Sequence, residues 1–188
     1  MLKHGILGLL NYGPMTGYEL KETFSHSLNY FWTAQTSQVY RELKTLETNG
    51  WVTEELVPQV GKPDKKPYTI TEEGRAELHR WLSDTSIGLS NNSPLLMKTF
   101  FLGELSLPEQ LSFFESQIES NRAFLTTIEL INERLKYYSA EVPNPDDARY
   151  WRMTLDFGAR LSHMIMDWSE ACMAEIQSAE AKKEGAAQ

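Results

Sequence analysis

Four polar residues between positions 37 and 44 have the types and spacing of a surface that contacts nucleic acid. Ser37, Arg41 and Lys44 stand three or four residues apart, so one face of a helix would carry them together, with Gln38 beside them. Arg and Gln side chains hydrogen-bond to the edges of guanine and adenine, and Ser and Lys suit phosphates or bases. On its own, the pattern is more typical of an ordinary solvated helix face.

A lysine cluster favours the nucleic-acid interpretation. Lys62, Lys65 and Lys66 place three positive charges within five residues of a turn that is rich in Gly and Pro. Asp64 is the only acid beside them in the sequence, so the cluster suits a phosphate backbone or a minor groove.

Two tyrosines could add hydroxyl donors to the same surface. Tyr18 stands at the start of an expected helix, and Tyr40 lies in the helix that carries Arg41. Either hydroxyl could donate to a phosphate. The alternative for each is a half-buried tyrosine of the core, which for Tyr40 is at least as good an interpretation.

Short helices are expected to position these residues in the first half of the chain. They are bounded by a capping box in which Thr16 and Glu19 satisfy each other's backbone amides, and by Gly50 as a stop signal. Apolar residues at helical spacing predict three helices, over 6–10, from Thr16 onward and over 36–49.

A β-hairpin is expected next, because the spacing of apolar residues changes after Gly50. Residues 51–57 and 68–70 read as strands, and 61–66 as the tip of the turn between them. Thr71 then caps a fourth helix. Three helices, a hairpin and a further helix predict a winged helix-turn-helix over residues 1–83.

The second half is predicted to be a pair of long antiparallel helices, over 94–188, after a polar linker at 84–93. One helix should run from the Ser106–Glu109 capping box to Ser139, and another from Asp147 to Ala179. Two such helices are too narrow to bury both faces, so they imply docking on a second copy. The expected dimer interface is Leu111, Phe114, Ile118, Asn121, Leu125, Ile128, Trp151, Leu155, Ile165 and Trp168.

The predicted fold class is therefore mainly α with a small β wing. The distribution of charge supports different roles for the two halves of the chain. The net charge is −8, but residues 1–83 hold nine basic and ten acidic residues, whereas 84–188 hold nine and sixteen. A near-neutral first half can bind phosphates if its bases cluster. With one cysteine, no signal-peptide pattern and no apolar run of about 20 residues, we expect a cytoplasmic protein away from membranes.

Catalytic and metal-binding interpretations are weak. His163 and Asp167 share a helix face as two possible metal ligands, but without a third ligand a surface hydrogen-bonded pair is favoured. Cys172 has no base near it in the sequence, so buried packing is favoured over a nucleophile. No phosphate-binding loop, dinucleotide fingerprint or nucleophile elbow is found. We expect neither an enzyme nor a bound cofactor or metal.

A small aromatic effector is a further expectation. Trp151, Phe157, Met164 and Trp168 could line a site for a flat ligand. Packing in the core and the dimer seam is the commoner use of such residues.

Several motifs, in this order and spacing, resemble the PadR family of transcription regulators. In the first half they are Met15–Leu20, Val39–Leu43 with Leu46, Glu47 and Gly50, and Gly61–Thr71 with Gly74 and Arg75. In the second half, Trp151, Thr154–Leu155, Phe157–Gly158 and Asp167–Trp168 are similar to the virulence-activator branch of that family.

The resemblance implies a homodimer that is held by the C-terminal helices and binds two-fold-related sites on double-stranded DNA. It assigns DNA contacts to Tyr18, Ser37, Gln38, Tyr40 and Arg41 and to the wing lysines, and it adds phenolic effectors bound near the domain junction. The chain departs from this expectation only in its acidic second half. That half motivates an alternative, a protein-interaction adaptor with little DNA binding.

Overall fold

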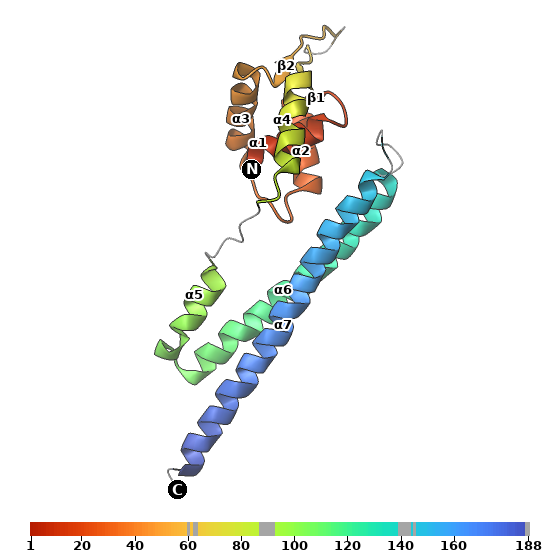
Figure 1. Cartoon of the computed structure of the whole chain (residues 1–188). Coiled ribbons are helices and arrows are strands. Elements are labelled where there is room, and N and C mark those ends of the chain that lie inside the picture. Colours follow the sequence, from red (N-terminus) through yellow and green to blue (C-terminus); the bar gives the residue numbers. More distant parts are fainter. Residues whose placement is uncertain (60, 62–63, 87–92, 139–143, 145, 187–188) are drawn as a thin grey trace. The chain divides into compact units, whose positions relative to one another are not determined.

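The chain divides into two units, Met1–Gly88 and Leu89–Gln188, in the computed structural model (Figure 1). The structure describes residues 1–59, 61, 64–86, 93–138, 144 and 146–186. Most of the predicted linker at 84–93 therefore lies outside the described residues, as does Lys62. We call these two parts of the chain unit 1 and unit 2.

Unit 1 is built around one hydrophobic core. Its helices are α1 (Leu2–Leu10), α2 (Gly17–Ser27), α3 (Thr36–Thr48) and α4 (Glu72–Ser83). The core takes side chains from α1, α2, α3 and the sheet, namely Ile6, Leu7, Leu9, Leu10, Leu20, Phe24, Val39, Leu43, Leu46, Val52 and Ile70. The helical spacing in the sequence predicted these elements, and the structure confirms the mainly helical fold with a small sheet.

Local hydrogen bonds explain where these helices begin. The Thr16 hydroxyl accepts from the Glu19 backbone N–H at 3.2 Å, and the Glu19 carboxylate accepts from the Thr16 N–H at 2.9 Å. Thr71 caps α4 through the Gly74 N–H at 3.0 Å. After α3, Gly50 has a φ of 70°, a conformation that glycine adopts at little cost.

Unit 1 also contains a three-stranded antiparallel sheet. Its strands are β1 (Met15–Thr16), β2 (Val52–Glu54) and β3 (Pro67–Ile70), in the order β1-β3-β2. Glu54 pairs with Tyr68, and a bridge between Val57 and Lys65 continues the pairing toward the tip. We call the hairpin from Val52 to Ile70 the wing. The sequence did not predict β1, because two residues are too few to carry a strand pattern.

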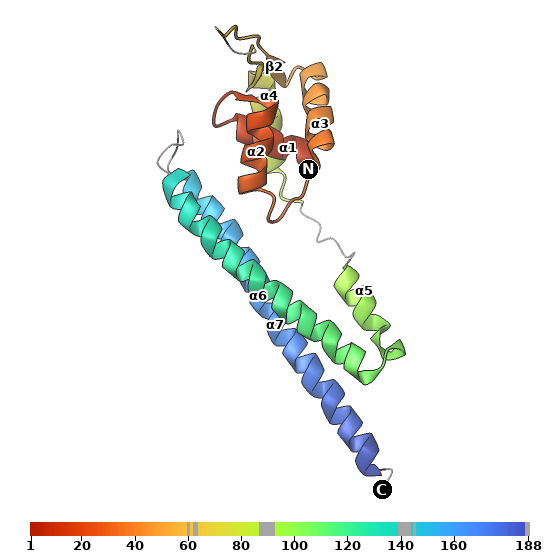
Figure 2. The ribbon, with the colours of Figure 1, turned by 180° about the vertical axis from the view of Figure 1, so that it is seen from behind.

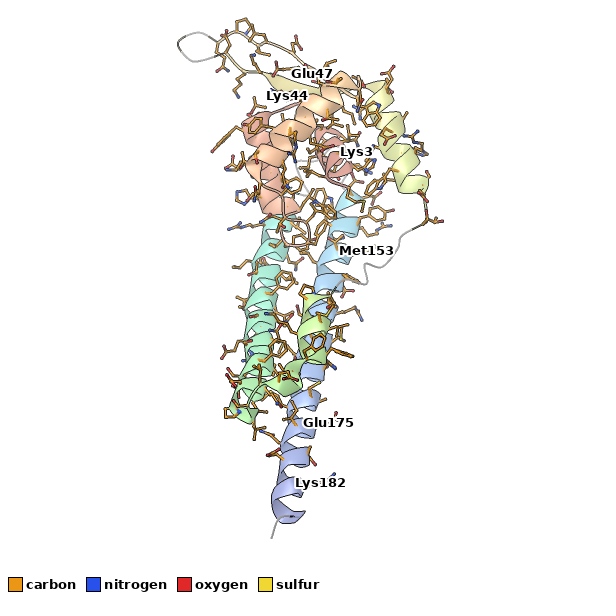
Figure 3. All side chains as sticks on the ribbon, turned by 90° about the vertical axis from the view of Figure 1, so that its left-hand side faces the viewer. Lys3, Lys44, Glu47, Met153, Glu175 and Lys182 are labelled. Carbon is orange, nitrogen blue, oxygen red and sulfur yellow. The ribbon has the colours of Figure 1, made fainter. Side chains whose placement is uncertain are left out.

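A buried polar cluster links α1 to α4. The Glu77 carboxylate is buried and accepts from Lys3 Nζ and His4 Nε2, each at 3.0 Å, and from Arg80. Figure 3 labels Lys3 in this unit. The His4 ring stacks on Trp81, with centroids 4.4 Å apart. Burial, with the nearby Lys3 charge, lowers the pKa of His4 to about 4, so a neutral His4 donates to Glu77 at pH 7.

All the regular secondary structure of unit 2 is helical in its described residues. It comprises α5 (Pro94–Phe100), the short 3-10 helix η1 (Leu102–Glu104), α6 (Leu107–Tyr138) and α7 (Asp147–Ala186). Figures 1 and 2 show α6 and α7 side by side and antiparallel. The predicted end of the last helix at Ala179 is wrong, since α7 continues to Ala186. Residues 180–184 are all Ala, Lys or Glu, which favour helix, and the first glycine comes only at position 185.

The seam between α6 and α7 uses residues that were predicted to face a second copy. Phe114, Ile128 and Leu155 are buried within this one chain. Trp168 packs edge-to-face on Phe114, with centroids 5.6 Å apart. The other predicted interface residues are half-buried, namely Leu111, Ile118, Asn121, Leu125, Trp151 and Ile165. Their part in a dimer stays a prediction, but the pair of helices already occupies much of this face.

A different stripe of α7 is apolar and exposed. Its members follow one another at three- or four-residue steps, so they lie along one face of the helix. They are Tyr150, Met153, Phe157, Leu161 and Met164. We call them the outer stripe; Figure 3 labels Met153. The sequence did not single this stripe out because its spacing equals that of the buried one.

Candidate nucleic-acid interface

The outward face of α3 carries the predicted recognition residues. Val39, Leu43 and Leu46 hold the helix to the core, each no more than 1% exposed. The opposite side is solvent-exposed and carries Ser37, Gln38, Tyr40, Arg41 and Lys44. Figure 3 shows Lys44 in the second half of α3. These residues share a surface, as the helical spacing predicted; their role at DNA stays a prediction.

Gln38 has a structural task as well. Its side-chain oxygen accepts the Gln35 backbone N–H at 2.8 Å, which caps the start of α3. Bidentate recognition of adenine needs both the oxygen and the nitrogen of the amide. Gln38 would therefore have to leave the cap to read adenine in that way, whereas its NH₂ group can donate from the capped position.

Tyr40 connects α3 to the start of α2. A Cβ atom built on Gly17 would lie 2.5 Å from the Tyr40 ring, so the absence of a side chain at position 17 lets the ring pack there. This close approach brings Tyr40 next to Tyr18. Local sequence patterns could not predict this contact, because Gly17 and Tyr40 lie more than twenty residues apart.

An open cleft of about 670 Å³ lies between the start of α2, α3 and the wing. Tyr18, Tyr40, Lys65 and Lys66, all predicted DNA contacts, line it together. The cleft also contains four carboxylates: Asp64, which the sequence already placed beside the lysines, and Glu19, Glu22 and Glu54, which the prediction left out. Four of the predicted residues thus meet in one place, but among more acidic than basic side chains.

Two of these carboxylates pair with the wing lysines. Lys65 Nζ lies 3.3 Å from Glu19 Oε1, and Lys66 Nζ lies 3.6 Å from Glu54 Oε2. The expectation that the lysines have no nearby acid except Asp64 is therefore wrong. Their partners come from α2 and β2, which folding brings close. Asp64 instead accepts the Gln59 backbone N–H at 3.1 Å and closes the loop.

Neutral donors hold both carboxylates in position. The Thr16 amide and hydroxyl hydrogen-bond to Glu19 and lower the pKa of that carboxyl, so it is charged at neutral pH. Burial raises the pKa of Tyr68 to about 12, and its hydrogen bond to Glu54 adds to the shift. The Tyr68 hydroxyl is therefore a donor to Glu54 across the working pH range.

The predicted effector residues do not enclose a cavity by themselves. Phe157 and Met164 belong to the outer stripe and are 67% and 53% exposed, so a closed site there would need a second surface to cover them. Trp168 is engaged with Phe114 in the α6–α7 seam, and Trp151 is half-buried.

Two kinds of feature are absent from the part of the chain that the structure describes. No three His, Cys, Asp or Glu side chains are grouped there so as to hold a metal ion. Among the same residues, no helix combines the length and the apolar character that crossing a membrane requires.

Comparison with known protein families gives two adjacent matches. The profile of the transcriptional regulator PadR-like family matches residues 6–80. The profile described as virulence activator alpha C-term matches residues 92–177. The first covers most of unit 1, and the second most of unit 2.

Comparison with individual proteins agrees with the profiles. The negative transcriptional regulator PadR of Bacillus subtilis is 33% identical over 180 residues, which cover 94% of this chain and 97% of that protein. Its crystal structure with operator DNA matches with a TM-score of 0.78 at 32% identity, over 93% of this chain and 98% of that one. Its structure with p-coumaric acid matches with a TM-score of 0.73 at 31% identity, over 94% and 95% of the two chains.

A more distant similarity concerns the fold alone. The virulence activator AphA of Vibrio cholerae matches with a TM-score of 0.73 at 24% identity, over 95% of this chain and 99% of that one. The similarity extends over both units of the chain, including the long helices.

Proposed function

This chain belongs to the PadR-like family of transcriptional regulators, and on that premise we propose that it binds promoter DNA as a homodimer. In this proposal α3 enters the major groove and the wing contacts the flanking backbone. The role is regulatory, not catalytic, and it is exercised in the cytoplasm, where such DNA lies.

The observation that carries the proposal is a continuous polar surface on unit 1. Tyr40 belongs both to the exposed face of α3 and to the cleft that Tyr18, Lys65 and Lys66 line. Arg41 and Lys44 extend this surface along α3. The relative in Bacillus subtilis was crystallised with operator DNA, which supports assigning the same kind of ligand to this chain.

The outer stripe supports the dimer. Five large apolar side chains in a row on α7 are costly to leave in water, and a contiguous exposed patch of this kind marks an interaction site. We assign a second copy of this chain to it, because a symmetric dimer presents two unit 1 surfaces to two-fold-related half-sites.

A small aromatic effector is a subordinate part of the proposal. It is supported by the structure of the Bacillus subtilis relative with p-coumaric acid. The side chains we assign to it are Trp151, Phe157, Met164 and Trp168. Calorimetric titration of the full chain with p-coumaric acid tests the assignment; heat that disappears in a Phe157→Ala variant would support it, and no heat at millimolar ligand would remove it.

The DNA proposal is tested by gel shift with the DNA upstream of the protein's own gene, in wild type and Arg41→Ala. Loss of one bidentate base contact per half-site should weaken binding by roughly ten- to a hundredfold. Lys182→Ala, a charge removed from the far end of α7, serves as the control and should bind like wild type. Equal binding by wild type and Arg41→Ala would contradict the assignment of α3.

A further inference from the structure

The wing lysines are held by acids of their own chain at the place where a phosphate should sit. The two wing lysines that the structure describes each have a carboxylate partner, Glu19 for Lys65 and Glu54 for Lys66. A phosphate that approaches either lysine therefore meets a competitor that is already bound. What happens next depends on which partner of each ion pair can move.

The carboxylates are the fixed partners. Glu19 uses its two oxygens separately: Oε2 accepts the Thr16 amide and hydroxyl, each at 2.9 Å, and Oε1 faces Lys65. Glu54 stands opposite Tyr68 in the β2–β3 ladder and receives its hydroxyl. Each carboxylate therefore keeps a hydrogen-bond donor when its lysine moves to a phosphate, so neither carboxylate is left without a partner.

The lysine side chains are the mobile partners. They are 51% and 60% exposed, and the cleft they line is open. Their backbone, in contrast, is fixed. The Lys65 N–H and C=O are both bonded to Val57, at 3.0 and 2.8 Å, and Pro67 pairs with Thr16 in the sheet. Either ammonium can change partner without any movement of the wing.

The free energy of the lysine–carboxylate pair is close to that of the lysine–phosphate contact that would replace it. An exposed ion pair stabilises the free protein only weakly. A phosphate on DNA offers a comparable partner, and its binding releases condensed counterions, so DNA can displace the carboxylate. The displaced carboxylate then remains beside the phosphate and repels it.

From this arrangement we infer that Glu19 and Glu54 act as built-in competitors of DNA phosphate for Lys65 and Lys66, and so weaken binding to DNA of any sequence. The inference rests on the proposed function, since it describes regulation of the same surface. As a consequence, the protein occupies a DNA site to a high degree only where α3 also contacts the bases, because the wing alone binds DNA weakly. The two glutamates are positioning residues that act through the lysines.

The test uses the full chain and a random-sequence duplex of about 25 base pairs, with affinity measured by fluorescence anisotropy at fixed salt. Glu19→Gln keeps the capping box, which accepts Gln as well as Glu, and removes only the charge. Glu54→Gln does the same on β2. We expect each variant to bind the duplex roughly 1.5- to fivefold more tightly than wild type, the size of a weak exposed ion pair.

Two controls separate this mechanism from a general change in charge. Glu22→Gln removes one negative charge from the same cleft without touching either ion pair, and it should have a smaller effect. In a Lys65→Ala background, Glu19→Gln should lose its effect, because the competition needs the lysine.

The outcomes are distinct. Unchanged or weaker binding by both variants would overturn the inference and would mean that the ion pairs only brace the wing. An equal gain with and without Lys65 would overturn it in favour of a long-range charge effect. If wild type and all variants fail to bind any duplex at low salt, the proposed function itself fails, and the inference with it.

Discussion

The two units of this chain differ in how completely they bury their apolar side chains. In unit 1, three helices and the sheet enclose a core whose members are at most 6% exposed. In unit 2, α6 and α7 bury one stripe each, while the outer stripe of α7 and much of α5 stay exposed, with Phe100 at 82%. Unit 1 therefore needs no partner to be stable, and unit 2 is incomplete without a second surface.

The same difference holds for the polar groups. In unit 1, two of the charges that are proposed to meet DNA, on Lys65 and Lys66, are already paired with Glu19 and Glu54. Unit 2 carries most of the net negative charge. On the proposed function, DNA contact belongs to unit 1 and assembly to unit 2, so each can be disturbed without the other.

The largest expected effect comes from breaking assembly. Phe157→Glu places a charge in the middle of the outer stripe, which a second copy cannot cover without burying it. We expect a monomer, and a loss of affinity for a two-fold operator of roughly a hundredfold or more, because the two half-sites are then bound independently. Light scattering and gel shift measure the two effects.

The control is Ser178→Glu, which adds the same charge to α7 outside the stripe. It should leave mass and affinity unchanged. If the Phe157→Glu protein kept the mass of a dimer, the interface would lie elsewhere, and the outer stripe would not be the surface that completes unit 2.

A second change should lower the stability of unit 1 and leave that of unit 2 unchanged. A Cβ atom on Gly74 would lie 2.1 Å from the Trp51 carbonyl oxygen and 2.9 Å from Ile70 Cγ1, so Gly74→Ala forces the start of α4 away from the sheet. We expect unit 1 to lose about 2–4 kcal/mol of stability. Gly8→Ala is the matched control, because a Cβ there meets nothing within 4 Å.

Thermal unfolding followed by circular dichroism would report both variants. The helical signal from α6 and α7 should persist when the unit 1 transition shifts. A single transition that moves as a whole would mean that the units are coupled in folding, contrary to the comparison.

The smallest effect is a pH dependence confined to unit 1. The folded pKa of His4, about 4, lies below its value of about 6.5 in the unfolded chain, so the unfolded state binds more protons between these values. Stability is therefore fully present above pH 6.5 and is lost as the pH falls. The loss should reach about 2 kcal/mol at pH 5.

His4→Gln should flatten this dependence, because glutamine takes up no proton. His79→Gln, an exposed position on α4, should not. The measurement is the unit 1 melting temperature at pH 7 and pH 5. Equal losses in wild type and His4→Gln would assign the dependence to another group.

Much of unit 1 could be predicted because its signals are local. The Thr16–Glu19 capping box, the stop at Gly50 and the spacing of Val39, Leu43 and Leu46 each act within a few residues. The partners of Lys65 and Lys66 could not be predicted in this way, since Glu19 lies 46 residues from Lys65 and only the β1–β3 pairing brings them close.

The long helices were predictable in type but not in orientation. Trp151, Leu155 and Ile165 repeat at helical spacing, and so do Met153, Phe157 and Met164, so periodicity alone predicts two apolar faces on α7. Only packing against α6 decides which face is internal. The outer stripe is the face left over, and it is the better candidate for a partner.

The central claim, that two copies of unit 1 read DNA through α3, is tested most directly by selecting bound duplexes from a random library with the full chain. We expect enrichment of an inverted repeat whose half-site centres lie about ten base pairs, or a multiple of that, apart. We also expect Arg41→Ala to relax the same base in both halves. No enriched sequence at low salt, or an enriched site without two-fold symmetry, would contradict the claim.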